Sequence, residues 1–371
     1  MSKKPRIALI AMGVMGGGPI GDGIPVLVDL FGKLSRHYEL VYYSFQPVDA
    51  SKVPPKIKIR QATRWWLPGR VKYMLVMLRL MFDHWLNSYQ LLFAVSAYPT
   101  GSAAVRLGQW LNVPVAVQLI ALEAVAIPEI GYGNLLHPWL ARITRVACEK
   151  AEHLIVVADY QGDVARKNLP TEREMISLPL RIDPRRFSYK KRSVTFPVEF
   201  IHVAYYNPVK GQDEMFRAFA LVAQHVDCRL TVIGDGYQND QLKELLEDLR
   251  IADKVLLKGL IHQSEIPMCF EKAHILLHMA RFETGCAVIQ EAMASGVAVC
   301  GTRVGILYDI GDQYAAIVAV DNVPEMAEKM LRLVREEKYF EALTDHAYRW
   351  ITEFDNVWSA EQYKHAIDRM L

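Results

Sequence analysis

The sequence predicts an α/β protein built on two parallel sheets. Short apolar runs alternate with longer stretches at helical spacing, a pattern typical of a parallel sheet covered by helices. The pattern occurs twice along the chain. Its 371 residues, 51% of them apolar, also exceed the roughly 250–300 residues at which a single core stops growing. We therefore expect two domains of the doubly wound type.

The buried runs give the expected strands in order, with helices between them. The first helix is expected over 23–34, directly after the first strand. A polar, proline-marked stretch, 183–197, joins the two halves, and its basic residues are expected to be solvated. The strands are expected at 7–12, 39–45, 91–96, 113–119 and 154–158 in the first half, and at 200–205, 229–233, 254–258, 275–278, 297–301 and 316–318 in the second.

Composition excludes several classes of protein. The net charge of +2, from 43 basic and 41 acidic side chains, gives no reason to expect a nucleic-acid partner. The five cysteines are widely spread and lack the close pairs of zinc and redox motifs, which favours reduced thiols in the cytoplasm. The first apolar stretch, 7–11, is too short for a signal-peptide core, and no segment reaches the roughly 20 apolar residues of a membrane span.

The loop after the first expected strand holds six glycines between positions 13 and 23. It includes G-x-G-x-x-G at Gly16, Gly18 and Gly21, the fingerprint of a dinucleotide-binding oxidoreductase. That fold also needs an acidic residue at the end of the second strand, whereas Glu39 stands at its start. An NAD(P)-dependent oxidoreductase therefore stays an alternative, as does a merely flexible connection. The preferred interpretation is backbone, including Gly21 and Gly23, that closes over a phosphate or acceptor.

Two glutamates seven residues apart, Glu283 and Glu291, follow an expected strand in the second half. The segment between them opens a helix that Gly296 ends. Glu283 in the loop can reach sugar hydroxyls, and Glu291, about two turns along the helix, can accept two ribose hydroxyls. Free backbone N–H groups at the helix start suit a diphosphate. These amides belong to Thr284, Gly285, Cys286 and Ala287.

This segment resembles the E-x7-E motif of the retaining GT-B glycosyltransferases of family 4 (glycosyl transferases group 1), usually close to E-G-x-G-x-x-x-x-E-A-x-A-x-G. Further stretches resemble the family's phosphate-clamp loop at 207–211, its glycine turn at 230–236 and its hinge at 179–187. The clamp loop contains Lys210, but the family's usual arginine falls at Tyr205. The resemblance covers roughly 7–360.

The resemblance implies a GT-B fold, with two Rossmann-like domains facing each other across a cleft. Residues 1–190 would form the acceptor-side domain, 191–350 the nucleotide-sugar-binding domain, and 351–371 a helix returning to the first domain. The implied enzyme is a retaining, metal-independent hexosyltransferase. It would move a sugar from a UDP- or GDP-sugar to a glycan or lipid-linked acceptor in cell-surface polysaccharide biosynthesis, with no cofactor besides that co-substrate.

The resemblance also assigns roles to residues. Lys210 and the four amides would stabilise the leaving diphosphate, Glu283 would orient the sugar and Glu291 the ribose. Backbone near Leu260 would hold the base. The histidine that relatives often carry near the donor sugar is missing from 114–123, so Gln118 or Glu123 is expected to replace its contact on the acceptor side. The alternative is that Glu123 only caps the next segment.

Two groups of residues allow a structural interpretation as well as a functional one. His274 and His278 would share a helix face as metal ligands, but their segment is expected to be a strand, and a packing role for His278 near the diphosphate is preferred.

The stretch 64–85, with Trp65, Trp66, Arg70 and Lys72, suits either core plus solvated edge or a membrane interface near a lipid-linked acceptor on the inner leaflet. The missing arginine and histidine leave a catalytically silent GT-B nucleotide-sugar-binding protein as a further alternative.

Overall fold

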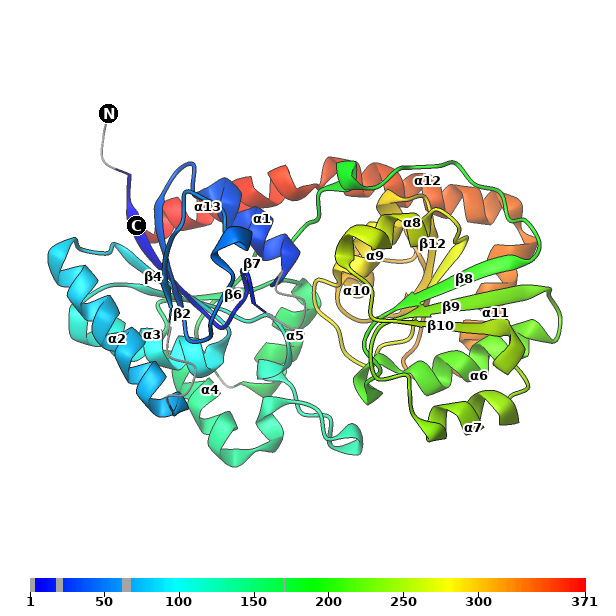
Figure 1. The fold of residues 1–371 in the computed structure, drawn as a ribbon, viewed down its shortest axis with the longest axis horizontal. Helices are drawn as coiled ribbons and strands as arrows, with labels where there is room; N and C mark the ends of the chain where they lie inside the picture. Colours follow the sequence, from blue (N-terminus) through cyan, green and yellow to red (C-terminus); the bar gives the residue numbers. More distant parts are fainter. Residues whose placement is uncertain (1–3, 18–22, 62–67, 170) are drawn as a thin grey trace. The chain divides into compact units, whose positions relative to one another are not determined.

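The computed structural model describes residues 4–17, 23–61, 68–169 and 171–371. The chain divides into two compact units (Figure 1): unit 1 comprises Met1–Leu180 and Asn356–Leu371, and unit 2 comprises Arg181–Asp355. The domain boundaries expected from the sequence lay after residues 190 and 350. Each unit is built on one parallel sheet with helices, so the predicted α/β class with two sheets is confirmed.

The sheet of unit 1 has seven parallel strands in the order β3-β2-β1-β4-β5-β6-β7. Five of them coincide with the buried runs expected from the sequence. The two edge strands, β3 and β7, were not predicted because their residues are only partly buried and form no apolar run. The strands are β1 (Arg6–Ala11), β2 (Glu39–Ser44), β3 (Lys58–Gln61), β4 (Leu91–Val95), β5 (Val115–Gln118), β6 (His153–Val156) and β7 (Met175–Ser177).

Alternate residues of the central strands face two different cores. Ile7 and Leu9 of β1 pack with α1, whereas Ala8 and Ile10 pack with α2, α3 and α4. Both faces are thus buried, as the continuous apolar runs indicated. The helices of this unit are α1 (Pro25–Leu34), α2 (Gly69–Leu86), α3 (Ser102–Leu111), α4 (Pro138–Lys150), α5 (Asp159–Asn168) and α13 (Asn356–Met370).

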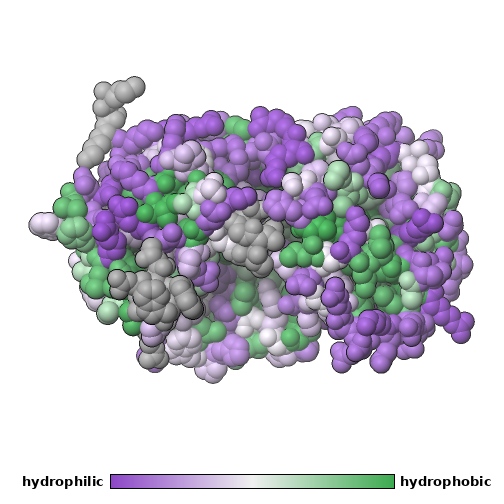
Figure 2. Space-filling model, viewed as in Figure 1, coloured by the Kyte–Doolittle hydropathy of each residue, from purple (hydrophilic) through white to green (hydrophobic). Residues whose placement is uncertain are grey.

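Helix α2 is apolar on two sides. Val76 and Leu80 are buried in the core of unit 1, while Met74, Leu78 and Trp85 are exposed, Trp85 by 79%. Figure 2 shows hydrophobic surface at the left edge of the view, where α2 lies in Figure 1. The described part of 64–85 therefore has a core side and an exposed side, as the interpretation of core plus solvated edge requires, while contact with a membrane stays a prediction. Trp65 and Trp66 lie outside the described residues.

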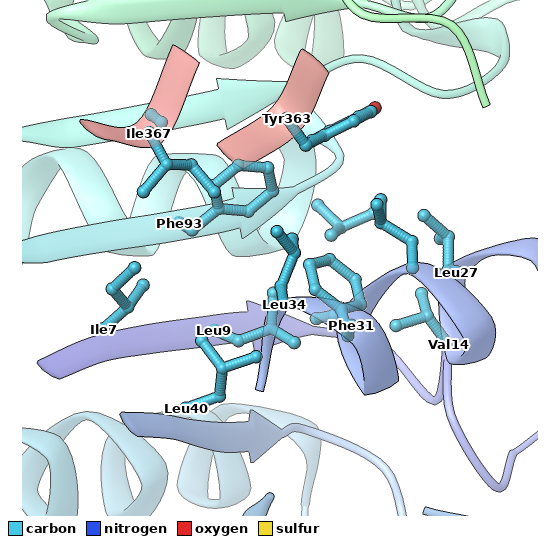
Figure 3. Close-up of a cluster of buried hydrophobic side chains, with 14 of the residues drawn as sticks. Ile7, Leu9, Val14, Leu27, Phe31, Leu34, Leu40, Phe93, Tyr363 and Ile367 are labelled. Atoms are coloured by element: carbon cyan, nitrogen blue, oxygen red, sulfur yellow. The ribbon is translucent and has the colours of Figure 1, made fainter. Parts of the chain in front are cut away.

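Helix α13 belongs to unit 1 although it follows unit 2 in the chain. Tyr363 and Ile367 are buried in the same cluster as Phe31, Leu34 and Phe93 (Figure 3). The Tyr363 hydroxyl donates to the carbonyl oxygen of Leu178 at 2.9 Å. Tyr38 of the segment after α1 donates to Asp368 at 2.6 Å, so α13 is attached by polar as well as apolar contacts.

The sheet of unit 2 has six parallel strands in the order β10-β9-β8-β11-β12-β13, and all six were expected. Helices α6 and α11 pack against each other over its core. The strands are β8 (Val198–Val203), β9 (Cys228–Ile233), β10 (Val255–Gly259), β11 (Ile275–His278), β12 (Ala298–Thr302) and β13 (Ala316–Val318). The helices are α6 (Gln212–Ala223), α7 (Asp240–Asp248), α8 (Ile266–Phe270), α9 (Ala287–Ala294), α10 (Ile306–Ile310), α11 (Val323–Arg335) and α12 (Glu337–Glu353).

The stretch before β8 is partly docked on unit 2. Four of its five basic residues are exposed, as expected, whereas Arg192 is only partly exposed. The Arg192 guanidinium donates to the carbonyl oxygens of Glu271 and Ser295, at 2.8 and 3.1 Å. The Tyr189 hydroxyl donates to Asp345 at 2.8 Å. Arg185 does lie mostly in solvent. Backbone carbonyls at the ends of helices attract such cations, which no local sequence pattern reveals.

Candidate active site

Two loops of unit 2 meet where the neighbouring strands β8 and β11 end. The short helix η7 (Pro208–Lys210) follows β8, and the loop that contains Glu283 follows β11. Gly211 makes this approach feasible: its φ is +60°, and a Cβ there would lie 2.0 Å from the carbonyl oxygen of Met279. Lys210 is thereby brought beside Glu283.

Glu283 is held as a buried carboxylate. Its side chain is 15% exposed, and Oε2 lies 2.5 Å from Lys210 Nζ and 3.5 Å from His278 Nε2. Burial opposes ionisation, but the Lys210 ammonium and the bond from His278 hold the pKa of Glu283 well below its usual range. Burial lowers the pKa of His278, so its ring is neutral at pH 7. The site thus presents a fixed ammonium–carboxylate pair.

The loop that leads into α9 is fixed from both sides. The Thr284 carbonyl oxygen accepts from the amide of Ile306 at 2.9 Å, and the Gly285 carbonyl oxygen accepts from the Gln290 side chain at 2.7 Å. The Thr284 amide donates to Glu283 Oε1 at 3.1 Å. The prediction of four free amides is therefore wrong for Thr284, because the neighbouring carboxylate already uses that donor.

Cys286 directly precedes α9, with Ala287 as the first helical residue, and has an unusual backbone conformation. Its φ is +29°, a region that side chains other than glycine rarely adopt. Its Sγ lies 3.6 Å from His278 Nε2. Burial raises the pKa of the Cys286 thiol well above its usual range, so at neutral pH it is protonated and a poor nucleophile.

Glu291 lies on α9 and is 7% exposed. Burial raises its pKa to about 7, while the charge of Arg186 and a hydrogen bond with Gln263 oppose that rise. Gln263 begins η9 (Gln263–Glu265), just after Leu260 at the end of β10. The structure therefore brings the segment that was expected to hold the base next to the residue expected to hold the ribose.

The predicted residues of unit 1 have different surroundings. Gln118 ends β5 and is fully buried, and neither polar atom of its amide has a partner among the described residues. The Glu123 carboxylate accepts at 2.7 Å from the amide of Ala121, which lies before Glu123 in the chain and not in the next segment. Gly23 has a φ of +74° and donates to Gly17, whereas Gly21 lies outside the described residues.

Glu39 lies at the end of its strand opposite to the ligand-binding edge that a dinucleotide site would use. It stands at the start of β2 and pairs with Lys58 at 2.8 Å and with Arg6 at 3.4 Å. Ligands of doubly wound sheets bind at the carboxyl ends of the strands, the opposite end from this carboxylate. This placement weakens the oxidoreductase alternative.

One feature of the site escaped the sequence analysis. Arg281 bonds Glu214 at 2.6 Å and Asp321 at 2.9 Å, and it donates to the Pro208 carbonyl oxygen at 3.0 Å. It therefore ties η7 to the Glu283 loop. Its position two residues before Glu283 was the only feature of the local sequence that pointed to this role. His274 is engaged by Thr195 and by the Glu199 amide, which accounts for it without a metal partner.

Comparison with solved structures identifies the fold. The chain matches sucrose-phosphate synthase from Thermosynechococcus elongatus with a TM-score of 0.80, at 15% identity and over 99% of both chains. It matches Anabaena HepE, solved in complex with UDP and glucose, with a TM-score of 0.76, at 14% identity and over 98% of this chain and 100% of that one. The predicted GT-B class with two Rossmann-like domains is confirmed.

The sequence of unit 2 resembles known glycosyltransferases. Residues 186–350 match the family model described as glycosyl transferases group 1. N-acetyl-alpha-D-glucosaminyl L-malate synthase of Bacillus anthracis is 28% identical over 156 residues, which are 41% of this chain and 40% of that relative. The alignment thus spans less than half of that curated relative. Unit 2 thus matches the group 1 model within a chain of GT-B fold, and the predicted resemblance to GT-B glycosyltransferases is confirmed.

Proposed function

We propose that this protein is a retaining, metal-independent glycosyltransferase. It moves a sugar from a UDP- or GDP-sugar to a glycan or lipid-linked acceptor in cell-surface polysaccharide biosynthesis. The observation that carries the proposal is the Lys210–Glu283 pair at the start of α9, with Glu291 buried further along the same helix. The family match supports a sugar donor, and the UDP and glucose bound to HepE support a nucleotide sugar.

Lys210 has two alternative anionic partners in this proposal. In the described structure its ammonium binds Glu283. A donor diphosphate at the start of α9 would compete for the ammonium, as anions are favoured at a helix N-terminus. Glu283 would then be released to accept a hydrogen bond from a sugar hydroxyl. Negative charge grows on the diphosphate as the glycosidic bond breaks, so Lys210 would stabilise the transition state more than the bound donor.

Retention follows from the direction of attack. The acceptor hydroxyl would approach the anomeric carbon from the face that the diphosphate leaves, and its proton would pass to a donor phosphate oxygen. No covalent glycosyl-enzyme intermediate is required. Catalysis would rest on positioning and charge stabilisation. Glu291 would accept two ribose hydroxyls, and the segment around Leu260 would contact the base.

A ligand panel tests this proposal. UDP- and GDP-sugars, the free diphosphates and NAD(P) are titrated while the melting temperature is followed, and hydrolysis and transfer are then screened. A sugar nucleotide should raise the melting temperature and turn over. Stabilisation by NAD(P) alone would support the oxidoreductase, and donor binding without turnover would support the silent binding protein.

The variant Glu291→Ala tests the proposed contact between Glu291 and the ribose. It should weaken binding of the free nucleoside diphosphate by about 2–3 kcal/mol, because it removes hydrogen bonds to a charged group. Glu247→Ala, an exposed glutamate of α7 in the same unit, is the control and should bind normally. Equal affinities of the two variants would exclude the ribose role.

The proposal includes contact with a membrane through unit 1. Trp85, Trp110 and Trp139, on α2, α3 and α4, are 79%, 70% and 60% exposed, and these helices cover the same face of the sheet. Arg142 and Arg145 are exposed on α4, after Trp139. Aromatic side chains interleaved with cations suit an anionic lipid interface. In the described parts of the chain, no helix is both long and apolar enough to cross a membrane.

A further inference from the structure

A thiol, an imidazole and a carboxylate converge at the start of α9. Among the described residues, Cys286, His278 and Glu283 form the one group of three whose potential ligand atoms all lie within 4.8 Å of one another. His278 ends β11, Glu283 lies in the following loop, and Cys286 precedes the helix. Sulfur, imidazole nitrogen and carboxylate oxygen are the three ligand types that zinc takes in proteins.

The spacing of these atoms suits a tetrahedral ion. Zinc with bonds of about 2.3 Å to sulfur and about 2.1 Å to nitrogen or oxygen sets its ligand atoms about 3.4–3.6 Å apart. Here Cys286 Sγ lies 3.6 Å from His278 Nε2, and Nε2 lies 3.5 Å from Glu283 Oε2. Three protein ligands would leave the fourth position for water or a phosphate oxygen.

The position of Cys286 adds an independent observation. A φ of +29° favours glycine, and holding another residue in such a region costs of order 1–3 kcal/mol. Glycine also stands at this place in the E-G-x-G motif quoted above. The chain thus places a thiol where the backbone alone would favour no side chain, directly against two further ligands.

We infer that Cys286, His278 and Glu283 bind a thiophilic divalent cation, with Zn²⁺ as the probe, and that the bound ion inhibits the enzyme. Binding displaces the thiol proton to solvent and the Lys210 ammonium from Glu283. The carboxylate is then no longer available to the donor sugar. The inhibitory part of the inference rests on the proposed function, whereas the metal site itself does not.

Metal binding is measured directly on the full chain. Co²⁺ serves as an optical probe, because a thiolate ligand gives it an intense charge-transfer absorption, and Zn²⁺ affinity is measured by competition with a chromophoric chelator. We expect one ion per chain and the charge-transfer band. Cys286→Gly, which suits the local backbone, should lose the band and at least about tenfold in Zn²⁺ affinity. Cys269→Ser, at a partly exposed cysteine of the same unit, should keep both.

Lys210→Ala separates this site from adventitious binding. Removing the competing ammonium should tighten Zn²⁺ binding by about tenfold, because the positive charge of Lys210 no longer repels the cation beside Glu283. Absence of the band, unchanged affinity in Cys286→Gly or weaker binding in Lys210→Ala would each overturn the inference.

Inhibition is measured separately from metal binding. Zn²⁺ should compete with the donor sugar, and a chelator should restore activity. If the band appears but no transfer is found with any donor, the proposed function fails and the metal site stands. If the metal binds while transfer continues at the same rate, the inhibitory role is refuted.

Discussion

Replacing Glu291 by glutamine tests the proposal that this helix keeps a carboxylate for a ligand at the expense of stability. Burial raises the pKa of Glu291 to about 7 from an ordinary 4.5, and Arg186 and Gln263 offset only part of that rise. A carboxyl whose pKa is higher in the folded state makes its full contribution to stability below pH 4.5. That contribution is lost as the pH rises through 7.

The difference in pKa sets the magnitude. Relative to a permanently neutral side chain, the ionised carboxylate should cost the folded protein about 1 kcal/mol at pH 5 and about 3 kcal/mol at pH 8. Glutamine keeps the shape and removes the charge. Glu291→Gln should therefore be more stable than the natural protein, by little at pH 5 and by up to about 3 kcal/mol at pH 8.

The assay is urea unfolding without ligand at the two pH values, with Glu247→Gln as an exposed control. The stability of the control should not change, whereas the gain of Glu291→Gln should grow with pH. Its affinity for the nucleoside diphosphate should fall, because an amide oxygen is a weaker acceptor for ribose hydroxyls than a carboxylate. A gain that is equal at pH 5 and pH 8, or no gain, would refute the reasoning.

Three further predictions concern other parts of the molecule. Lys210→Ala should lower the transfer rate more than the affinity for the donor, as measured by steady-state kinetics. Lys243→Ala removes another lysine that pairs with a carboxylate and should change neither quantity. Equal losses in rate and affinity for Lys210→Ala would indicate that Lys210 contributes to ground-state binding only. Arg142→Glu with Arg145→Glu should reduce co-sedimentation with anionic vesicles, and salt should weaken the natural protein's binding; supernatant protein at every lipid composition would contradict membrane contact. Tyr363→Phe should cost about 1–3 kcal/mol in chemical denaturation by leaving the Leu178 carbonyl oxygen unpaired, and an unchanged midpoint would argue against that bond.

The sequence was most informative where a pattern is local. Buried strands of parallel sheets are continuous apolar runs, so eleven of the strands were visible, whereas β3 and β7 are partly exposed and were not. Glu283 and Glu291 lie on one continuous loop and helix, so their spacing in the sequence was enough to predict their relative positions. The electrostatic surroundings of Glu291 could not be predicted in the same way, because the charge of Arg186 and the hydrogen bond with Gln263 come from distant parts of the chain.

Contacts between distant segments account for what was missed. The tie made by Arg281 joins three loops, and no spacing in the sequence encodes it. The Thr284 amide was expected to be free because helix starts usually leave donors unpaired, but an ionised neighbour takes it. Arg192 departs from the expectation of a solvated linker for the same reason, because its guanidinium donates to backbone carbonyl oxygens of two other segments.

The discontinuity of unit 1 has a consequence for synthesis on the ribosome. Unit 2 is one continuous stretch, Arg181–Asp355, and its last element leaves the ribosome before α13 does. The core of unit 1 includes Tyr363 and Ile367, so that unit cannot complete its packing until α13 has been translated. Unit 1 therefore begins synthesis first but completes its folding last. Until α13 is available, unit 1 is a nascent intermediate with an exposed apolar face that chaperones can recognise.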